Sequence, residues 1–476
     1  MPPSANPTSV IILAAGLGKR MFSSLPKPLI PVCGRSMLFH ILDQVSEVAP
    51  QARVAVVVGH QKETVIKEVK AQNFPLEIDF IEQSEQKGTG HAVKCVMEST
   101  WGKETVPRKE NVLVLPGDLP LMQADLVREM MEPLKRGSAM KLLSAVLPDP
   151  HGYGRIVRKG KQGTVLRIVE EKDANVRERM INEVGVSIYT FNSAFLSGGV
   201  AGLKNNNAQK EYYLTDLIAL AVTKKRTIET HIWDNSEDVR GVNNPYELAQ
   251  AGDILNNRVI KKHALNGVRF VCLNSCRVDP TVKIAQDVTI YPNVILEGST
   301  EISGGTMIGH NVFLKNVKVG KGAEIKAGTY AEDSIIGDRV KLGPYAHLRP
   351  ESVIKEDAKV GNFVELKKTT IGAKTSVAHL SYLGDATVGA GVNIGCGFVT
   401  CNFDGRVIDG SRKHKTIIED NVFVGSDCQV IAPITLKKGS YVASGSTLTD
   451  DLEEDALAIA RSRQVTKPGY AKKLRG

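Results

Sequence analysis

The chain of 476 residues lacks any long apolar run, and this absence excludes a membrane-spanning helix. A transmembrane helix needs about 20 consecutive apolar residues, and no stretch of even about 18 uncharged apolar residues occurs. Residues 1–9 are too short and too rich in proline for a signal peptide. We therefore expect neither a membrane span nor secretion.

Cysteine is also scarce, which argues against a disulfide framework. The seven cysteines are an odd number and lie scattered along the chain, as in reduced cytoplasmic proteins. Cys272 and Cys276 lack partners at zinc-site spacing, so we expect no structural metal there. The sequence thus predicts a cytoplasmic protein with free thiols.

Nucleic-acid-binding signals are missing despite a net charge of +9. No known nucleic-acid module and no basic stripe interleaved with aromatic residues is present, and part of the excess lies in the tail KPGYAKKLRG. Anionic small substrates or a solvated tail explain the charge equally well. We expect no nucleic-acid partner.

What the first half does contain is an alternation of strand-like and helix-like segments. The runs SVIILA, ARVAVVVG, LEIDFIEQ and NVLVLPGD are rich in β-branched residues, whereas MLFHILDQV and ADLVREMMEPL have helical spacing. Such alternation predicts a doubly wound α/β sheet whose ligands lie at the carboxyl ends of the strands.

The loop ILAAGLGKRMFSSLPKPL, residues 12–29, follows the first of these strands. It fails the dinucleotide pattern, because Met21 stands where a third glycine is needed, and it lacks the spacing of a Walker loop. Its small residues allow close backbone approach, and Arg20 and Lys27 suit a leaving polyphosphate. A tight turn with two solvated basic residues explains this loop alone equally well.

Five companion segments favour the polyphosphate interpretation. Asp118 directly follows the apolar strand NVLVL, where a carboxylate fills a core poorly but can hold Mg²⁺ between phosphates. Gln83, in QSEQKGTGHA, can read a base edge. The segments HGYGRI, IVEEKDA and NNNAQKEYYLTDL place further polar groups around Gly154, Glu170 and Tyr213.

Together these motifs resemble a known enzyme family. LAAG, GKRM, LPK, GTGHA, GYGR and GVNN occur in register over residues 8–245. This part resembles the sugar-nucleotide pyrophosphorylases, most closely the uridylyltransferase half of the bacterial bifunctional N-acetylglucosamine-1-phosphate uridylyltransferase/glucosamine-1-phosphate acetyltransferases. The resemblance implies that Arg20, Lys27 and Asp118 are catalytic and that Asp118 and Asn243 hold Mg²⁺. The implied site for UTP and the UDP-sugar comprises Leu13, Ala14, Ala15, Gly16, Lys27, Gln83, Gly88, Thr89, Pro116, Gly117, Asp118, Gly154, Glu170, Glu183 and Asn243.

Two departures from the family concern the sugar contacts. The family has an asparagine before Thr-Gly in the segment that reads NEVGV here, so Glu183 is expected at a sugar-contact position. It often has a tyrosine where Pro116 precedes Gly117.

The second half follows a six-residue rhythm. Aliphatic residues recur at every sixth position in several runs between Val278 and Leu448, which neither a helical nor a strand period explains. A hexapeptide repeat explains it by placing one aliphatic per step inside a parallel β-helix. Between the halves, residues 244–263 predict a helix, with Asn244 as its cap, Pro245 in its first turn and Glu247 completing a capping box.

Two interruptions of the rhythm predict a second active site. The segment AHLSYLGDATVG contains His379, which can accept a proton near neutral pH, and residues 401–415 form a basic loop. HLRPES, VGNFVELKK, VNIGCG, CNFDG and ALAIAR resemble the acetyltransferase half of the same family over residues 263–466. The resemblance implies His379 as general base. It implies a sugar-phosphate site of Arg349, Lys367, Tyr382 and Asn393 and an acetyl-CoA site of Cys396, Asn402, Phe403, Ser426, Ser444 and Arg461.

This acetyl-CoA site also departs from the family. Cys396 and Ser444 stand where alanines are usual, Phe403 replaces a tyrosine, and the loop before Lys413 is longer.

The sequence therefore predicts three parts. Residues 1–243 form a Rossmann-like doubly wound nucleotidyltransferase domain, 244–263 a linker helix, and 264–476 a left-handed parallel β-helix with a basic tail. The expected protein is a bifunctional homotrimer that uses acetyl-CoA, UTP and Mg²⁺ to make UDP-N-acetylglucosamine from glucosamine-1-phosphate. One alternative is a single-function pyrophosphorylase with a structural β-helix, and a second is a regulatory assembly protein with the same folds.

Overall fold

The computed structural model describes residues 8–160, 163–407 and 410–475. It separates into two compact units that divide between Leu255 and Asn256. The division falls inside helix α9 (Pro245–Leu265), where the sequence predicts a helix at 244–263. None of the helices in the described ranges combines the length and apolarity needed to span a bilayer.

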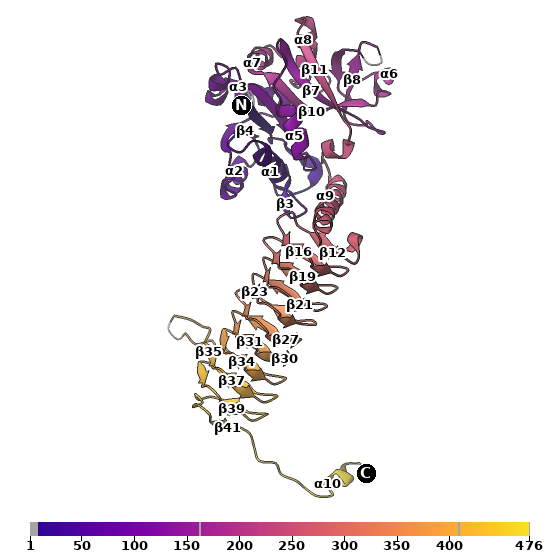
Figure 1. Ribbon diagram of the computed structural model, residues 1–476. Coiled ribbons are helices and arrows are strands. Elements are labelled where there is room, and N and C mark those ends of the chain that lie inside the picture. Colours follow the sequence, from indigo (N-terminus) through magenta and orange to yellow (C-terminus); the bar gives the residue numbers. More distant parts are fainter. Residues whose placement is uncertain (1–7, 161–162, 408–409, 476) are drawn as a thin grey trace, which may run out of the picture. The chain divides into compact units, whose positions relative to one another are not determined.

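A mixed β-sheet forms the centre of the first unit (Figure 1). Four strands, in the order β5 (Glu77–Glu82), β4 (Arg53–Val58), β1 (Thr8–Leu13) and β6 (Asn111–Pro116), are parallel and correspond to the four predicted strands. Next to β6, β10 (Glu183–Asn192) runs antiparallel, followed by β7 (Ser138–Val146) and β11 (Thr227–Trp233). A hairpin of β8 (Gly154–Arg158) and β9 (Val165–Val169) pairs with β10.

Both faces of this sheet are buried, as a doubly wound fold requires. On β1, Val10 and Ile12 belong to one apolar core and Ile11 to the other, because successive side chains point to opposite faces. The first core receives α1 (Met37–Val48), α2 (Lys62–Ala71) and α5 (Ala124–Met131). The second receives α3 (Thr89–Glu98), α4 (Thr100–Thr105), α7 (Ser193–Ala201) and α8 (Asp216–Thr223).

Helix α9 begins with the predicted cap, but Glu247 accepts from the Asn243 backbone N–H and from Asn244 Nδ2, both at 2.7 Å, instead of closing a capping box. Asn244 Oδ1 accepts a hydrogen bond from the Glu247 backbone N–H at 2.9 Å, and Pro245 occupies the first position. Leu248, Ala251 and Leu255 then pack against a small core of the first unit.

The second unit is a left-handed parallel β-helix (Figure 1). Among the described residues its sheets have 11, 10 and 9 short strands, running from β12 (Arg269–Phe270) to β41 (Leu457–Ala458), from β13 (Arg277–Val278) to β40 (Thr447–Leu448) and from β14 (Lys283–Ile284) to β38 (Ile434–Leu436). Many strands are two residues long, with one side chain outside and the next inside. The aliphatic residues of the six-residue repeat form one continuous core. Ile284 is partly buried, and the other repeat aliphatics between Val278 and Leu448 are buried. The hexapeptide interpretation of the sequence is therefore confirmed.

Candidate functional site

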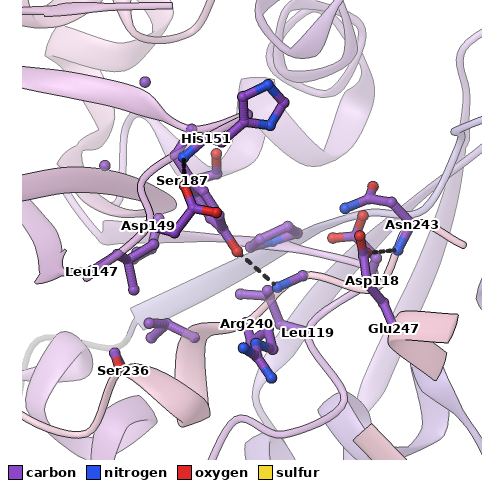
Figure 2. A pocket seen from close by; sticks show the side chains of 18 of the residues that line it. Asp118, Leu119, Leu147, Asp149, His151, Ser187, Ser236, Arg240, Asn243 and Glu247 are labelled. Atoms are coloured by element: carbon purple, nitrogen blue, oxygen red, sulfur yellow. Dashed lines mark hydrogen bonds between the residues drawn. The ribbon is translucent and has the colours of Figure 1, made fainter. Parts of the chain in front are cut away.

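A cavity of about 720 Å³ opens in the first unit beside the carboxyl end of β6 (Figure 2). Six of the residues that the sequence assigns to the site line it, and they come from five separate segments of the chain. They are Arg20, Pro116, Asp118, Gly154, Glu170 and Asn243. The fold thus gathers residues more than 220 positions apart in sequence around one space.

Lys27, Asp118 and Asn243 meet at one point. Lys27 Nζ donates hydrogen bonds to Asp118 Oδ2 at 2.6 Å and to Asn243 Oδ1 at 3.2 Å. A carboxylate and an amide oxygen that converge in this way are ligands that Mg²⁺ accepts, with phosphates and water completing its shell. Asp118 and Asn243 therefore fit a magnesium ion. Among the described residues there is no metal site made of three or more His, Cys, Asp or Glu side chains, so the ion would need phosphate and water ligands as well.

Three successive backbone amides fix the segment that carries Asn243. Gly241 N–H donates to the Tyr153 hydroxyl at 3.3 Å, Val242 N–H to the Asp118 carbonyl at 3.0 Å and Asn243 N–H to Glu247 Oε2 at 2.7 Å. Burial raises the pKa of Tyr153, and the hydrogen bond from Gly241 opposes this. Asn243 is thereby held relative to Asp118. Sequence reasoning did not assign these roles to Tyr153 and Glu247, although both lie in segments it quoted.

The residues expected at the nucleotide lie beside this cavity, around the ends of β1 and β5. Gly117 N–H donates to the Leu13 carbonyl at 2.9 Å, which joins the loops after β6 and β1. A Cβ on Gly117 would lie 2.7 Å from that carbonyl oxygen, so a larger residue there would force the loops apart. Gln83 Nε2 donates to the Gly88 carbonyl at 3.1 Å, just before α3.

The remaining predicted nucleotide contacts occupy the same loops. Ala14 and Ala15 are 5% and 6% exposed, and Thr89 Oγ1 accepts a hydrogen bond from Leu214 N–H at 3.3 Å. Gly16 has no atom within 4 Å of the place where a Cβ would lie, so the backbone there is open to an approaching ligand.

Glu170 places a half-buried carboxyl in the wall of the cavity. Burial raises its pKa, while the Thr215 hydroxyl, which donates to Oε1 at 3.0 Å, lowers it. Gly154 lies against it, because a Cβ there would be 3.4 Å from Glu170 Oε2. This pair gives the cavity a polar wall suited to hydroxyl groups.

The structure does not bring Glu183 to this cavity. Its carboxylate pairs with Arg158, at 2.6 Å and 2.7 Å, and accepts a hydrogen bond from Ser144 Oγ at 2.7 Å. The β10 residues that line the cavity are Gly185, Val186 and Ser187. The expected sugar contact of Glu183 therefore stays a prediction, since its carboxylate is engaged by Arg158 in this structure.

Four predicted residues, together with Asn362, form a column on one sheet of the β-helix. Its strands are β27 (Lys359–Asn362), β30 (Ser376–His379), β33 (Asn393–Ile394), β36 (Phe423–Val424) and β39 (Tyr441–Val442). Their registers place Asn362, His379, Cys396, Ser426 and Ser444 one above the other in successive coils. Adjacent coils are about 4.8 Å apart, so the column is a continuous track.

Asn362 contacts the histidine of this column directly. His379 Nδ1 lies 2.6 Å from Asn362 Oδ1, and the two residues pair in register. Farther along, Ser426 N–H donates to Ser444 Oγ at 3.2 Å, and the side chain of Arg461 lies over Gly445. Asn362 lies in the motif VGNFVELKK, but the sequence alone did not indicate a role for it.

The predicted sugar-phosphate residues lie mainly on the adjoining sheet. Here β25 (His347–Leu348), β28 (Glu365–Lys367), β31 (Tyr382–Gly384) and β34 (Val399–Cys401) are neighbours. Arg349 Nη1 lies 3.2 Å from Glu365 Oε1, and Glu365 pairs in register with Tyr382. Lys367 pairs with Gly384.

Asn402 joins Tyr382 to the basic loop. Burial raises the pKa of Tyr382, and its hydrogen bond with Asn402 opposes this. Asn402 Nδ2 donates to Asp385 Oδ2 at 2.6 Å. In the loop, Lys413 Nζ lies 4.3 Å from the ring centre of Phe403, whereas Asn393 is exposed on β33.

Comparisons with known proteins cover both units. A family model described as the MobA-like NTP transferase domain matches residues 10–157, and one described as the GMPPB C-terminal domain matches residues 272–357. The chain is 41% identical over 466 residues to "Bifunctional protein GlmU" of Geotalea uraniireducens, covering 98% of this chain and 99% of the relative. Proteins of the same name from Geotalea daltonii (43% over 463 residues, covering 97% and 98%) and Clostridioides difficile (41% over 464 residues, covering 97% and 97%) are similar throughout.

Proposed function

This chain belongs to the family of bifunctional GlmU proteins, and from that premise we propose that it acetylates glucosamine-1-phosphate with acetyl-CoA and then transfers UMP from UTP to the product. The observation that carries this proposal is that each unit holds its own set of reactive groups. Lys27, Asp118 and Asn243 converge in the first unit, and Asn362 and His379 pair in the second.

The β-helix site supplies a general base for acetyl transfer. Asn362 Oδ1 can only accept a hydrogen bond, so it selects the His379 tautomer with the proton on Nδ1 and leaves Nε2 free. Nε2 takes the proton as the amine of glucosamine-1-phosphate attacks the thioester carbon. The carbon–nitrogen bond forms, the carbon–sulfur bond breaks, and CoA leaves. Arg349 and Lys367 supply positive charge for the sugar phosphate.

The cavity of the first unit suits the second reaction. A phosphate oxygen of N-acetylglucosamine-1-phosphate attacks the α-phosphorus of UTP in line, and the bond to the β-phosphate breaks to release pyrophosphate. Arg20 and Lys27 stabilise the leaving pyrophosphate. Asp118 and Asn243 would hold Mg²⁺, which neutralises phosphate charge when bound. Gly154 and Glu170 contact the sugar.

We propose that the protein acts as a cytoplasmic homotrimer built along the β-helix. Tyr345, Phe363 and Leu380 occupy successive corners and are 56%, 58% and 56% exposed, with the two rings stacked at 5.7 Å. Such an exposed apolar row supports a contact with a neighbouring chain. All seven cysteines are free, which suits a reducing compartment.

Two assays of the purified protein test the proposed function. Acetyl-CoA-dependent loss of free amine from glucosamine-1-phosphate measures the first activity, and UTP-dependent release of pyrophosphate with N-acetylglucosamine-1-phosphate measures the second. We expect both. Pyrophosphate release without any acetylation would leave a pyrophosphorylase with a structural β-helix, and absence of both activities would favour the regulatory assembly protein.

Asn362 gives a more specific prediction. Asn362→Ala removes the acceptor at Nδ1, so both tautomers of His379 become populated and acetyl transfer is expected to fall about 10-fold. Asn362→Asp keeps the acceptor and adds a negative charge, which favours the protonated imidazole. Because the base must be neutral, the rising limb of its pH–rate profile should move to higher pH. An unshifted limb in Asn362→Asp, measured with uridylyl transfer as internal control, would contradict this role.

A further inference from the structure

The wall of the cavity contains a cation, Arg240, that has no role in the reaction as proposed above. It lines the cavity together with Asp118, Leu119 and Asn243 (Figure 2). Arg240 is exposed, and within the described part of the chain no hydrogen bond or ion pair of its guanidinium is recorded. An arginine without a carboxylate partner, in a cavity that receives phosphates, is available to bind an anion.

The backbone on both sides of Arg240 is held in place. The 3-10 turn η3 (Ser236–Val239) ends just before it, and Val239 and Val242 are buried at 1% and 0% exposure. Gly241 N–H is bonded to the Tyr153 hydroxyl, as described above. These anchors fix the point from which the Arg240 side chain extends.

The charge of Arg240 reaches Tyr153, which lines the same cavity. Burial raises the pKa of Tyr153, while the positive charge of Arg240 lowers it. Tyr153 immediately precedes Gly154, which contacts the sugar in the proposed reaction. The two cations proposed for pyrophosphate, Arg20 and Lys27, come instead from the loop after β1.

The reaction needs positive charge at two places. The attacking sugar phosphate and the triphosphate are both anionic, so their approach is unfavourable unless each meets its own counter-charge. The proposed reaction assigns Arg20 and Lys27 to the departing phosphates and assigns no described cation to the attacking phosphate. We propose that Arg240 binds the phosphate of the incoming sugar 1-phosphate in the uridylyl transfer reaction. This assignment rests on the proposed function.

The test compares Michaelis constants for each substrate. In Arg240→Gln the KM for N-acetylglucosamine-1-phosphate should rise about 10-fold or more, because a charge-assisted hydrogen bond is lost. The KM for UTP, and the KM for pyrophosphate in the reverse reaction, should change less than about twofold. Arg240→Lys keeps the charge but not the planar pair of donors, so it should restore the sugar-phosphate KM only in part. Arg136→Gln, which removes an exposed arginine outside the cavity, is the matched control.

Each outcome separates this inference from the proposed function. An unchanged sugar-phosphate KM in an active Arg240→Gln protein overturns the inference and leaves the reaction standing. A selective rise in the KM for UTP or pyrophosphate also overturns it, since Arg240 would then serve the triphosphate. A wild-type protein without uridylyl transfer would overturn the proposed function itself. Equal acetyl transfer in all variants shows that the chain is folded.

Discussion

His379→Ala is expected to lower acetyl transfer to glucosamine-1-phosphate by about 10²- to 10⁴-fold, the usual contribution of a general base. The side chain is exposed at the end of β30, so its removal leaves no cavity in the β-helix core. Asn362 Oδ1 would lose its partner but remain accessible to water. Uridylyl transfer, which uses residues of the other unit, should keep its wild-type kcat and KM.

A matched histidine in the same β-helix provides the control. His310 is exposed and lies outside the column of Asn362, His379 and Cys396, so His310→Ala should keep both activities. Initial rates of amine loss and of pyrophosphate release should be measured on the same preparations. If His379→Ala retained acetyl transfer at the wild-type rate, another group would have to take the amine proton. If it abolished both reactions in a folded protein, the two sites would not be independent.

The β-helix was predictable from sequence because its period is a direct consequence of its geometry. Each strand places one aliphatic side chain inside, so aliphatic residues such as Leu366 and Ile371 recur in every coil. A polar side chain at such a position would be buried without a hydrogen-bond partner. The α/β unit was predictable for a similar reason, since strands buried on both faces are continuously apolar. The antiparallel direction of β10 was not predictable, because an apolar strand does not encode its direction.

The candidate sites were predictable where a motif contains the functional group itself. Asp118 follows a buried strand, and His379 interrupts a repeat, so both stand out in the chain. Glu183 lies in a stretch that departs from the family; in the structure its carboxylate pairs with Arg158 while Gly185 lines the cavity, so its expected sugar contact stays a prediction. Partners that act through hydrogen bonds across the fold, such as Asn362 and Tyr153, carry no local signal of their role.

Asp118→Ala is expected to have the opposite effect to His379→Ala. It removes a carboxylate that Lys27 contacts at 2.6 Å and that is one of the two side chains proposed to hold Mg²⁺. Uridylyl transfer should fall by about 10²- to 10³-fold or more, since loss of one preorganised electrostatic group has effects of that order. Acetyl transfer should be unchanged. Asp125→Ala, which removes an exposed carboxylate on α5, should affect neither reaction.

Asp118→Asn separates the charge of this residue from its shape. The amide oxygen can still accept from Lys27, but the loss of negative charge weakens a magnesium ligand, so saturation of pyrophosphate release should need more Mg²⁺ than in the wild type. The backbone carbonyl of residue 118 still accepts from Val242 N–H, so the segment that carries Asn243 stays in place. A Mg²⁺ titration with the wild-type midpoint and a wild-type rate in Asp118→Asn would show that this carboxylate holds no metal. A shifted midpoint, with acetyl transfer intact, would assign the metal to the point where Asp118 and Asn243 converge.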